Sequence, residues 1–91
     1  MPKLLKKELL PIGSVVLLKG GNKAIMIYGR KVHMKENDEL KLFDYVACLY
    51  PEGYSSQNYS AFFNHINIDK IYHVGYINDD EKFLKIELLS Q

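Results

Sequence analysis

Three side chains at four-residue spacing, His65, Asp69 and His73, are the first candidates for chemistry in this chain. On one continuous helix, that spacing would bring two imidazoles and a carboxylate to one face, a set that binds metals such as zinc. A strand is expected to begin at Ile71, however, and the surrounding residues are β-branched: Ile66, Ile68, Ile71 and Val74. The three side chains would then point apart, so we expect neither a metal nor a cofactor here.

Other reactive residue types lack the partners that catalysis needs. The loop Lys19–Lys23, KGGNK, could offer backbone amides and two ammonium groups to a phosphate. It is too short for a Walker loop, and asparagine follows its second glycine, so a hairpin turn is favoured. Cys48 lies in an apolar stretch, where a thiol is usually inert, and Glu36 and Glu52 have no second carboxylate at a defined spacing. We therefore expect no enzyme and no catalytic residue.

The composition bounds the class of protein. The chain has 91 residues, of which 47% are hydrophobic and 25% charged, and this is ordinary for one small globular domain over residues 1–91. A single cysteine excludes an internal disulfide, and small domains without disulfides are typical of reducing compartments. Lys6, Lys7 and Glu8 interrupt the N-terminal leucines before a signal peptide or a membrane span could form. We expect a cytoplasmic protein with no membrane partner.

The formal net charge of +1 hides a division along the chain. Residues 1–35 carry eight basic side chains and one acid, whereas residues 36–91 carry four basic side chains and ten acids. Such asymmetry creates a field that is able to attract an acidic partner or a nucleic acid. The two halves could equally face each other and cancel, since scattered surface charges interact weakly in water.

The first third of the chain predicts a helix followed by a β-hairpin. Residues 1–10 carry leucines that could line one side of a helix, and Pro11 would end it. Ser14–Leu18 and Ala24–Tyr28 are apolar at both alternating sets of positions, which indicates strands covered on both faces. Lys19–Lys23 joins them with residues that tolerate the positive φ angles of tight hairpin turns.

The middle of the chain predicts an antiparallel meander. We expect the second strand to continue through Met34, a loose turn over Lys35–Glu39 and a third strand over Phe43–Tyr50. Tyr50–Gly53 has proline and glycine where a β-turn favours them. Three further elements are expected: a short strand over Ala61–Asn64, one helical turn capped by Asn67 and running through Lys70, and a strand over Ile71–Ile77 in which Gly75 marks a bulge or a close backbone contact.

The C-terminal segment predicts a helix over residues 79–89. Asn78, with Glu81 three residues later, resembles a capping box, and Glu81 with Lys85 would form an ion pair on the solvent side. Four apolar residues are expected to cover the sheet: Phe83, Leu84, Ile86 and Leu88. The whole order predicts an α+β fold whose strongly bent antiparallel sheet of about five strands spans residues 13–77, either open or closed into a small SH3-like barrel.

Two groups of side chains are candidate binding surfaces. The first is aromatic and surrounds the Tyr50–Gly53 turn: Tyr50, Tyr54, Tyr59, Phe62 and Phe63. Tyrosine-rich loops are favoured at protein interfaces, although the same rings could fill a thin core. The second is a hypothetical basic surface made of four residues: Lys19, Lys23, Arg30 and Lys31.

Several segments in a fixed order resemble a known bacterial family. They are LPIGSVVLLKGG, IMIYGR, FDYVACLYPEGY and FFNHINIDKIYHVGY, followed by an acidic start to the last helix. Together they resemble the bacterial domain of unknown function 4176 family. The resemblance transfers no catalytic residue. It implies a small cytoplasmic protein with an accessory or adaptor role, of the kind that Gram-positive bacteria often encode near type VII secretion and polymorphic-toxin genes.

We therefore predict a non-enzymatic protein-binding accessory or adaptor module. Its partner would be a secreted toxin or the helical accessory protein of such a toxin, bound through the aromatic loop and attracted by the basic first third of the chain. The alternative is a small β-barrel that binds nucleic acid through the four basic residues and exposed tyrosines. The oligomeric state stays open, because an exposed strand edge could pair two chains.

Overall fold

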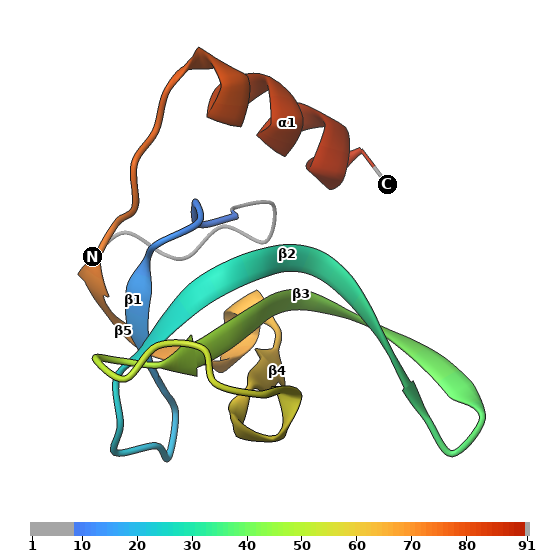
Figure 1. Ribbon diagram of the computed structural model, residues 1–91. Coiled ribbons are helices and arrows are strands. Elements are labelled where there is room, and N and C mark those ends of the chain that lie inside the picture. The colour runs from blue at the N-terminus through green and yellow to red at the C-terminus, as the bar shows by residue number, and fades with distance from the viewer. Residues whose placement is uncertain (1–8, 91) are drawn as a thin grey trace.

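Five strands and one α-helix make up residues 9–90, the part of the chain that the structure, a computed structural model, describes (Figure 1). The strands are β1 (Val15–Leu18), β2 (Ile25–Glu36), β3 (Glu39–Leu49), β4 (Ala61–Phe63) and β5 (Ile68–His73). Two 3-10 turns, η1 (Gln57–Tyr59) and η2 (His65–Asn67), lie on either side of β4, and the helix α1 (Asp79–Leu89) follows β5.

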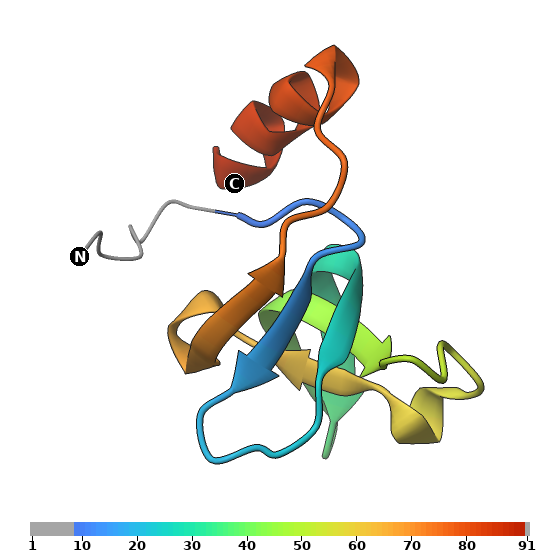
Figure 2. The same ribbon diagram turned by 90° about the vertical axis from the view of Figure 1, so that its left-hand side faces the viewer.

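All five strands belong to one antiparallel sheet in the order β4-β3-β2-β1-β5, which confirms the predicted antiparallel sheet of about five strands. β2 and β3 are strongly bent (Figure 1). The segment that precedes β1 lies between the sheet and α1, as both views show (Figure 1, Figure 2). The helix therefore packs on the sheet through this segment.

The glycine hairpin between β1 and β2 is confirmed. Val15 pairs with Met26 and Val16 pairs with Ile25, while Gly20 lies in the turn at a φ angle of +78°. Glycine accepts this angle, whereas a side chain would be strained there. β1 pairs with β5 on its other side, so this short strand lies inside the sheet, and its first two residues are buried.

The long β2–β3 ladder ends in a two-residue turn at Asn37 and Asp38. Both residues have positive φ angles, as a type I′ hairpin requires. The prediction that the third strand begins at Phe43 is wrong, because β3 begins at Glu39. The first four residues of β3 are exposed, so backbone pairing rather than an apolar pattern extends the strand.

The hydrophobic core lies on one face of the bent sheet. Its buried members come from all five strands and from the segment before β1: Leu9, Leu10, Val16, Ile25, Ile27, Tyr45, Ala47, Phe63 and Ile68. Because side chains alternate along a strand, Val15, Val46 and Cys48 occupy the opposite face, where they are also buried. The sheet therefore buries part of both faces.

The predicted N-terminal helix falls largely on residues 1–8, which lie outside the described residues. Leu9 and Leu10 are described, and both are buried in an irregular segment rather than in a helix. Within residues 9–90, no helix is long and apolar enough to cross a membrane.

The prediction that Asn67 caps a helical turn through Lys70 is wrong. Asn67 ends the turn η2, and its side-chain oxygen accepts a hydrogen bond from Asn64 N at 2.9 Å. β5 begins at the next residue, Ile68, and it ends at His73, earlier than predicted. An asparagine at either end of a short turn is able to bond the backbone, so the local sequence does not show which side of Asn67 the turn occupies.

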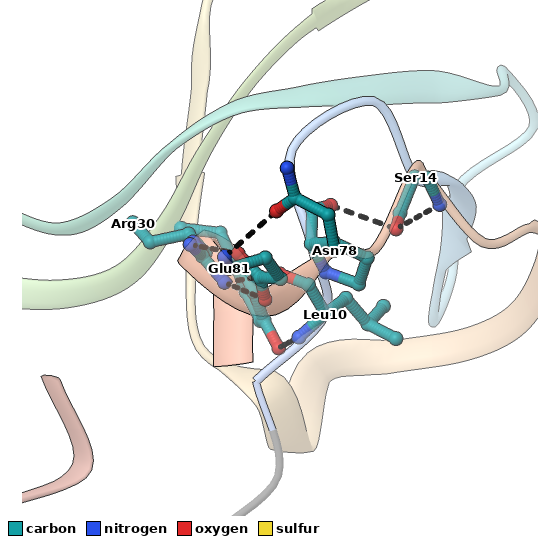
Figure 3. Close-up of polar contacts among 8 residues, drawn as sticks. Leu10, Ser14, Arg30, Asn78 and Glu81 are labelled. Atoms are coloured by element: carbon teal, nitrogen blue, oxygen red, sulfur yellow. Dashed lines mark hydrogen bonds and ion pairs between the residues drawn. The ribbon is translucent and has the colours of Figure 1, made fainter. Parts of the chain in front are cut away.

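Gly75 makes the close backbone contact that was one of its two predicted roles. A Cβ atom built on Gly75 would lie 2.0 Å from the carbonyl oxygen of Ile12. The buried hydroxyl of Ser14 joins the same crossing, since it donates to Pro11 O at 2.8 Å and accepts from Gly75 N at 3.0 Å (Figure 3). The segment that leads from β5 to α1 is therefore fixed against the residues before β1.

The start of α1 is confirmed, because Asn78 Oδ1 accepts a hydrogen bond from Glu81 N at 3.0 Å (Figure 3). Three of the four apolar residues expected to cover the sheet are instead exposed: Phe83, Leu84 and Ile86. Only Leu88, together with Leu89, packs against the core. The inward face of the helix runs through Glu81, Lys85 and Leu88, which share one side at helical spacing, so the intervening apolar residues face solvent.

Replacing Gly75 by alanine should lower the free energy of unfolding by about 2 kcal/mol or more, because the added methyl group meets backbone that cannot turn aside. Gly20→Ala is the control, since no atom lies within 4 Å of its Cβ position. Its expected loss of about 1 kcal/mol comes from the left-handed backbone alone. Chemical denaturation measures both, and a smaller loss at Gly75 than at Gly20 would contradict the tight crossing.

Candidate functional site

The structure divides the predicted aromatic surface into two parts. Tyr50, Tyr54 and Tyr59 are exposed on the turn and loop that follow β3. Phe63 is buried in the core beside Tyr45, with ring centroids 5.3 Å apart. Phe62 is partly buried in β4 and packs near another phenylalanine of β3. The three tyrosines are therefore available to a partner, whereas the two phenylalanines hold β4 against the sheet.

The exposed tyrosines sit on backbone that is held in place. In the Tyr50–Gly53 turn, Gly53 N donates to Leu49 O at 2.7 Å. Tyr54 meets the ring of Tyr28 edge to face, with centroids 5.3 Å apart. The hydroxyl of Tyr28 is hydrogen-bonded to Ser60 Oγ at 2.7 Å. This side of the loop is thus attached to β2, and the ring of Tyr54 is held against that of Tyr28.

An open pocket of about 500 Å³ adjoins this surface. Its lining residues come from the outer face of the sheet and from the turn: Gly13, Val15, Met26, Tyr50, Tyr72 and His73. Tyr50 and Tyr72 are both about half exposed. The lining of this pocket is mainly apolar and aromatic.

The end of β5 and the residues that follow it form a second exposed apolar segment, which the sequence analysis did not identify. Its members run along the chain toward α1: Ile71, Tyr72, Val74, Tyr76 and Ile77. They were predicted to belong to one strand over Ile71–Ile77, and their exposure was not predicted. No local signal in the sequence could have found them, because their exposure depends on β5 lying at the border of the sheet.

The four residues of the hypothetical basic surface do not form one free patch. Lys23 pairs with Glu52 at 3.0 Å and Lys31 pairs with Asp44 at 3.1 Å, while Lys19 is exposed. The assignment of Arg30 to the surface is wrong, because its side chain is only 3% accessible. A guanidinium that is buried to this degree must be paired.

Arg30 makes a bidentate ion pair with Glu81 of α1. Arg30 Nη1 donates to Glu81 Oε2 at 2.8 Å and Nη2 donates to Oε1 at 2.6 Å (Figure 3). Arg30 Nη1 also donates to the carbonyl of Leu10 at 3.3 Å. Glu81 was expected to pair with Lys85 in solvent, but its side chain is 12% accessible and turned toward β2. The pair therefore joins the first turn of α1 to the sheet.

His65 takes part in a buried polar chain rather than a metal site. Its Nδ1 is hydrogen-bonded to Tyr45 Oη at 2.6 Å, and its backbone N donates to Asp44 Oδ2 at 2.9 Å. Leu10 N donates to the same Tyr45 hydroxyl at 2.9 Å. Asp69 and His73 lie on β5, and residues 9–90 hold no group of three histidine, cysteine, aspartate or glutamate residues placed to bind a metal ion.

The three remaining residues that were considered for catalysis are either buried or in ion pairs. Cys48 is a buried free thiol whose Sγ lies 3.7 Å from Met26 O. Glu36 pairs with Lys41 at 3.2 Å near the end of the β2–β3 ladder. Glu52 accepts a hydrogen bond from Lys23, and this bond holds the pKa of the Glu52 carboxyl below its ordinary value.

The comparison with protein families agrees with the resemblance found in the sequence. A family model described as a domain of unknown function, DUF4176, matches residues 9–84. The chain belongs to the DUF4176 family. The matched region of this DUF4176 protein includes all five strands, the exposed tyrosines and both partners of the buried ion pair. No curated protein and no solved structure matches the chain.

Replacing Arg30 by methionine should lower the free energy of unfolding of this DUF4176 protein by roughly 3 kcal/mol or more, because the carboxylate of Glu81 is left buried without its partner. The double variant Arg30→Met/Glu81→Leu should recover part of the loss. Lys41→Met is the control, since its half-exposed pair with Glu36 is worth less than about 1 kcal/mol. Similar losses at Arg30 and Lys41 in denaturation curves would contradict this assignment.

Lys23→Met should raise the pKa of Glu52 toward its ordinary value, because the ammonium that favours the carboxylate is removed. The folded pKa is depressed, so the pair stabilises the fold above the ordinary carboxyl pKa, and that contribution is lost as the pH falls through the depressed value. Carbon-detected NMR titration of the carboxyl group measures the pKa. Lys41→Met should leave it unchanged, and an unaltered Glu52 titration in Lys23→Met would refute the cause.

Proposed function

We propose that this DUF4176 protein is a non-enzymatic protein-binding adaptor. The observation that carries the proposal is the display of Tyr50, Tyr54 and Tyr59 on an anchored turn and loop beside an open apolar pocket. Exposed aromatic groups of this kind are favoured at protein interfaces, because each rigid ring offers a large contact area at a low cost in entropy. Holding the backbone in place before binding lowers that cost further.

The proposed partner is a secreted toxin of a type VII secretion system, or the helical accessory protein of such a toxin, in the cytoplasm. The family resemblance supports this context, and the surface described above suits a partner that inserts an apolar side chain into the pocket. Lys19 is exposed near one end of the sheet, where it would help to attract an acidic segment of the partner.

We also propose that the sheet curls into a nearly closed, SH3-like barrel that stays open between β4 and β5. The two border strands, β4 and β5, are joined by only four residues, 64–67. A connection of that length spans a short distance, so the strong bend of β2 and β3 must bring the two borders near each other. Small barrels of this kind often present loops at one end as binding surfaces.

The alternative of nucleic-acid binding has less support. Of the four cations proposed for it, Arg30 is buried against a carboxylate, and Lys23 and Lys31 are each paired with one. Neutralised side chains release few counterions from phosphates.

The experiment is co-purification of the tagged chain with the product of each adjacent gene, followed by calorimetric titration of any complex. Tyr59→Ala and Tyr54→Ala should each weaken binding about tenfold or more, since central aromatic residues dominate interface energies. Leu40→Ala is the control, because Leu40 is equally exposed but lies at the far end of the β2–β3 ladder. Failure of every adjacent gene product to bind would contradict the proposal, as would equal weakening by all three variants.

A further inference from the structure

β5 is an open border of the sheet. It pairs with β1 on one side, and no described strand pairs with it on the other (Figure 2). The opposite border, β4, has three residues, whereas β5 has six. Unpaired N–H and C=O groups on a border strand recruit another strand unless the border is blocked. Here the strand continues into the exposed apolar segment that follows Ile71.

We propose that a second copy of the chain occupies this border, with the two β5 strands antiparallel and a two-fold axis at Ile71. In such a contact each residue meets the one at the same distance on the other side of the axis. Asp69 then lies opposite His73 of the second copy, where a carboxylate is able to accept a hydrogen bond from an imidazole N–H. Lys70 lies opposite Tyr72 of the second copy, where its ammonium is able to contact the aromatic ring.

A two-fold axis at a neighbouring residue would give a less favourable pairing of the two β5 strands. An axis at Asp69 or at Lys70 would bring two like charges directly opposite each other, which destabilises a strand pair. An axis at Tyr72 would leave both Asp69 and Lys70 without a polar partner across the border. The axis at Ile71 is the one that gives complementary contacts to every charged residue of the strand, and each contact occurs twice.

The two most exposed large apolar side chains among the described residues agree with the same axis. Tyr76 is 80% accessible and Ile66 is 74% accessible, and they lie five positions on either side of Ile71. Antiparallel pairing directs the segment that follows one β5 toward the segment that precedes the other. Tyr76 of each copy thereby approaches Ile66 of its partner, and burial of both removes apolar surface from water.

The dimer would be reversible and would affect the pocket. Two register shifts against β1 twist β5, so the new ladder is confined to a few residues around Ile71, and side-chain contacts carry much of the interface. Tyr72 and His73 also line the open pocket. A second copy placed along β5 would therefore narrow one side of the pocket and present two such pockets in one particle.

Sedimentation velocity of the full chain over a range of concentrations tests the proposal. The unmodified chain should shift from the mass of one chain to that of two as its concentration rises. Asp69→Lys should raise the dissociation constant about tenfold or more by removing the carboxylate opposite His73. The double variant Asp69→Lys/His73→Asp should restore dimerisation, because it reverses the pair in both copies. Glu39→Lys, the same charge change on exposed β3, is the control and should have no effect.

Ile71→Cys tests the position of the axis. A thiol on the axis faces its equivalent and should form an intermolecular disulfide under mild oxidation, while Cys48 is buried. Tyr72→Cys is the matched control, since its two thiols would be offset along the strands beyond the reach of a disulfide. The proposal would be overturned if the chain stayed monomeric at every concentration, or if Asp69→Lys left the dissociation constant of the dimer unchanged. Equal cross-linking of the two cysteine variants would also overturn it.

Discussion

The buried guanidinium of Arg30 is the interaction on which the placement of the helix depends. Its side chain is almost inaccessible, and a charge in that environment is stable only when it is paired and fully hydrogen-bonded. Glu81 supplies both carboxylate oxygens and Leu10 supplies a carbonyl, so one cation joins β2, α1 and the segment before β1 (Figure 3). Separating α1 from β2 would leave the charge unpaired, and displacing the segment before β1 would remove the third acceptor, so the guanidinium holds the three segments together.

Hydrogen bonds extend this constraint through the core. Leu10, whose carbonyl accepts from Arg30, donates its N–H to the hydroxyl of Tyr45. That hydroxyl is bonded to His65 in the turn between the two border strands, and the backbone of His65 is bonded to Asp44 on β3. Polar groups inside an apolar core tolerate little misplacement. The same contacts that fix α1 therefore also fix the turn that carries the chain from β4 to β5.

Some local signals predicted local structure correctly, but none could predict these long-range contacts. The Gly20 turn and the Asn78 cap depend on residues a few positions apart, and both are confirmed. Arg30 and Glu81 are 51 positions apart, and Lys85, one turn along the helix, was the more evident partner for Glu81. Which partner a carboxylate takes depends on the side of the helix that is buried, and a single sequence with a weakly amphipathic helix does not specify that side.

The same reasoning explains why the aromatic group could be located in the sequence, whereas the sequence did not show which of its rings are buried and which are exposed. Strand pairing decides that Phe63 enters the core, because β4 lies beside β3 and side chains alternate along it. Tyr59 has no such neighbour, since it closes a short turn that pairs with no strand. An exposed aromatic side chain gains nothing from folding and exposes apolar surface to water. The exposure of Tyr59 follows from the lack of a neighbouring strand, and this exposure is what places Tyr59 in the proposed binding surface.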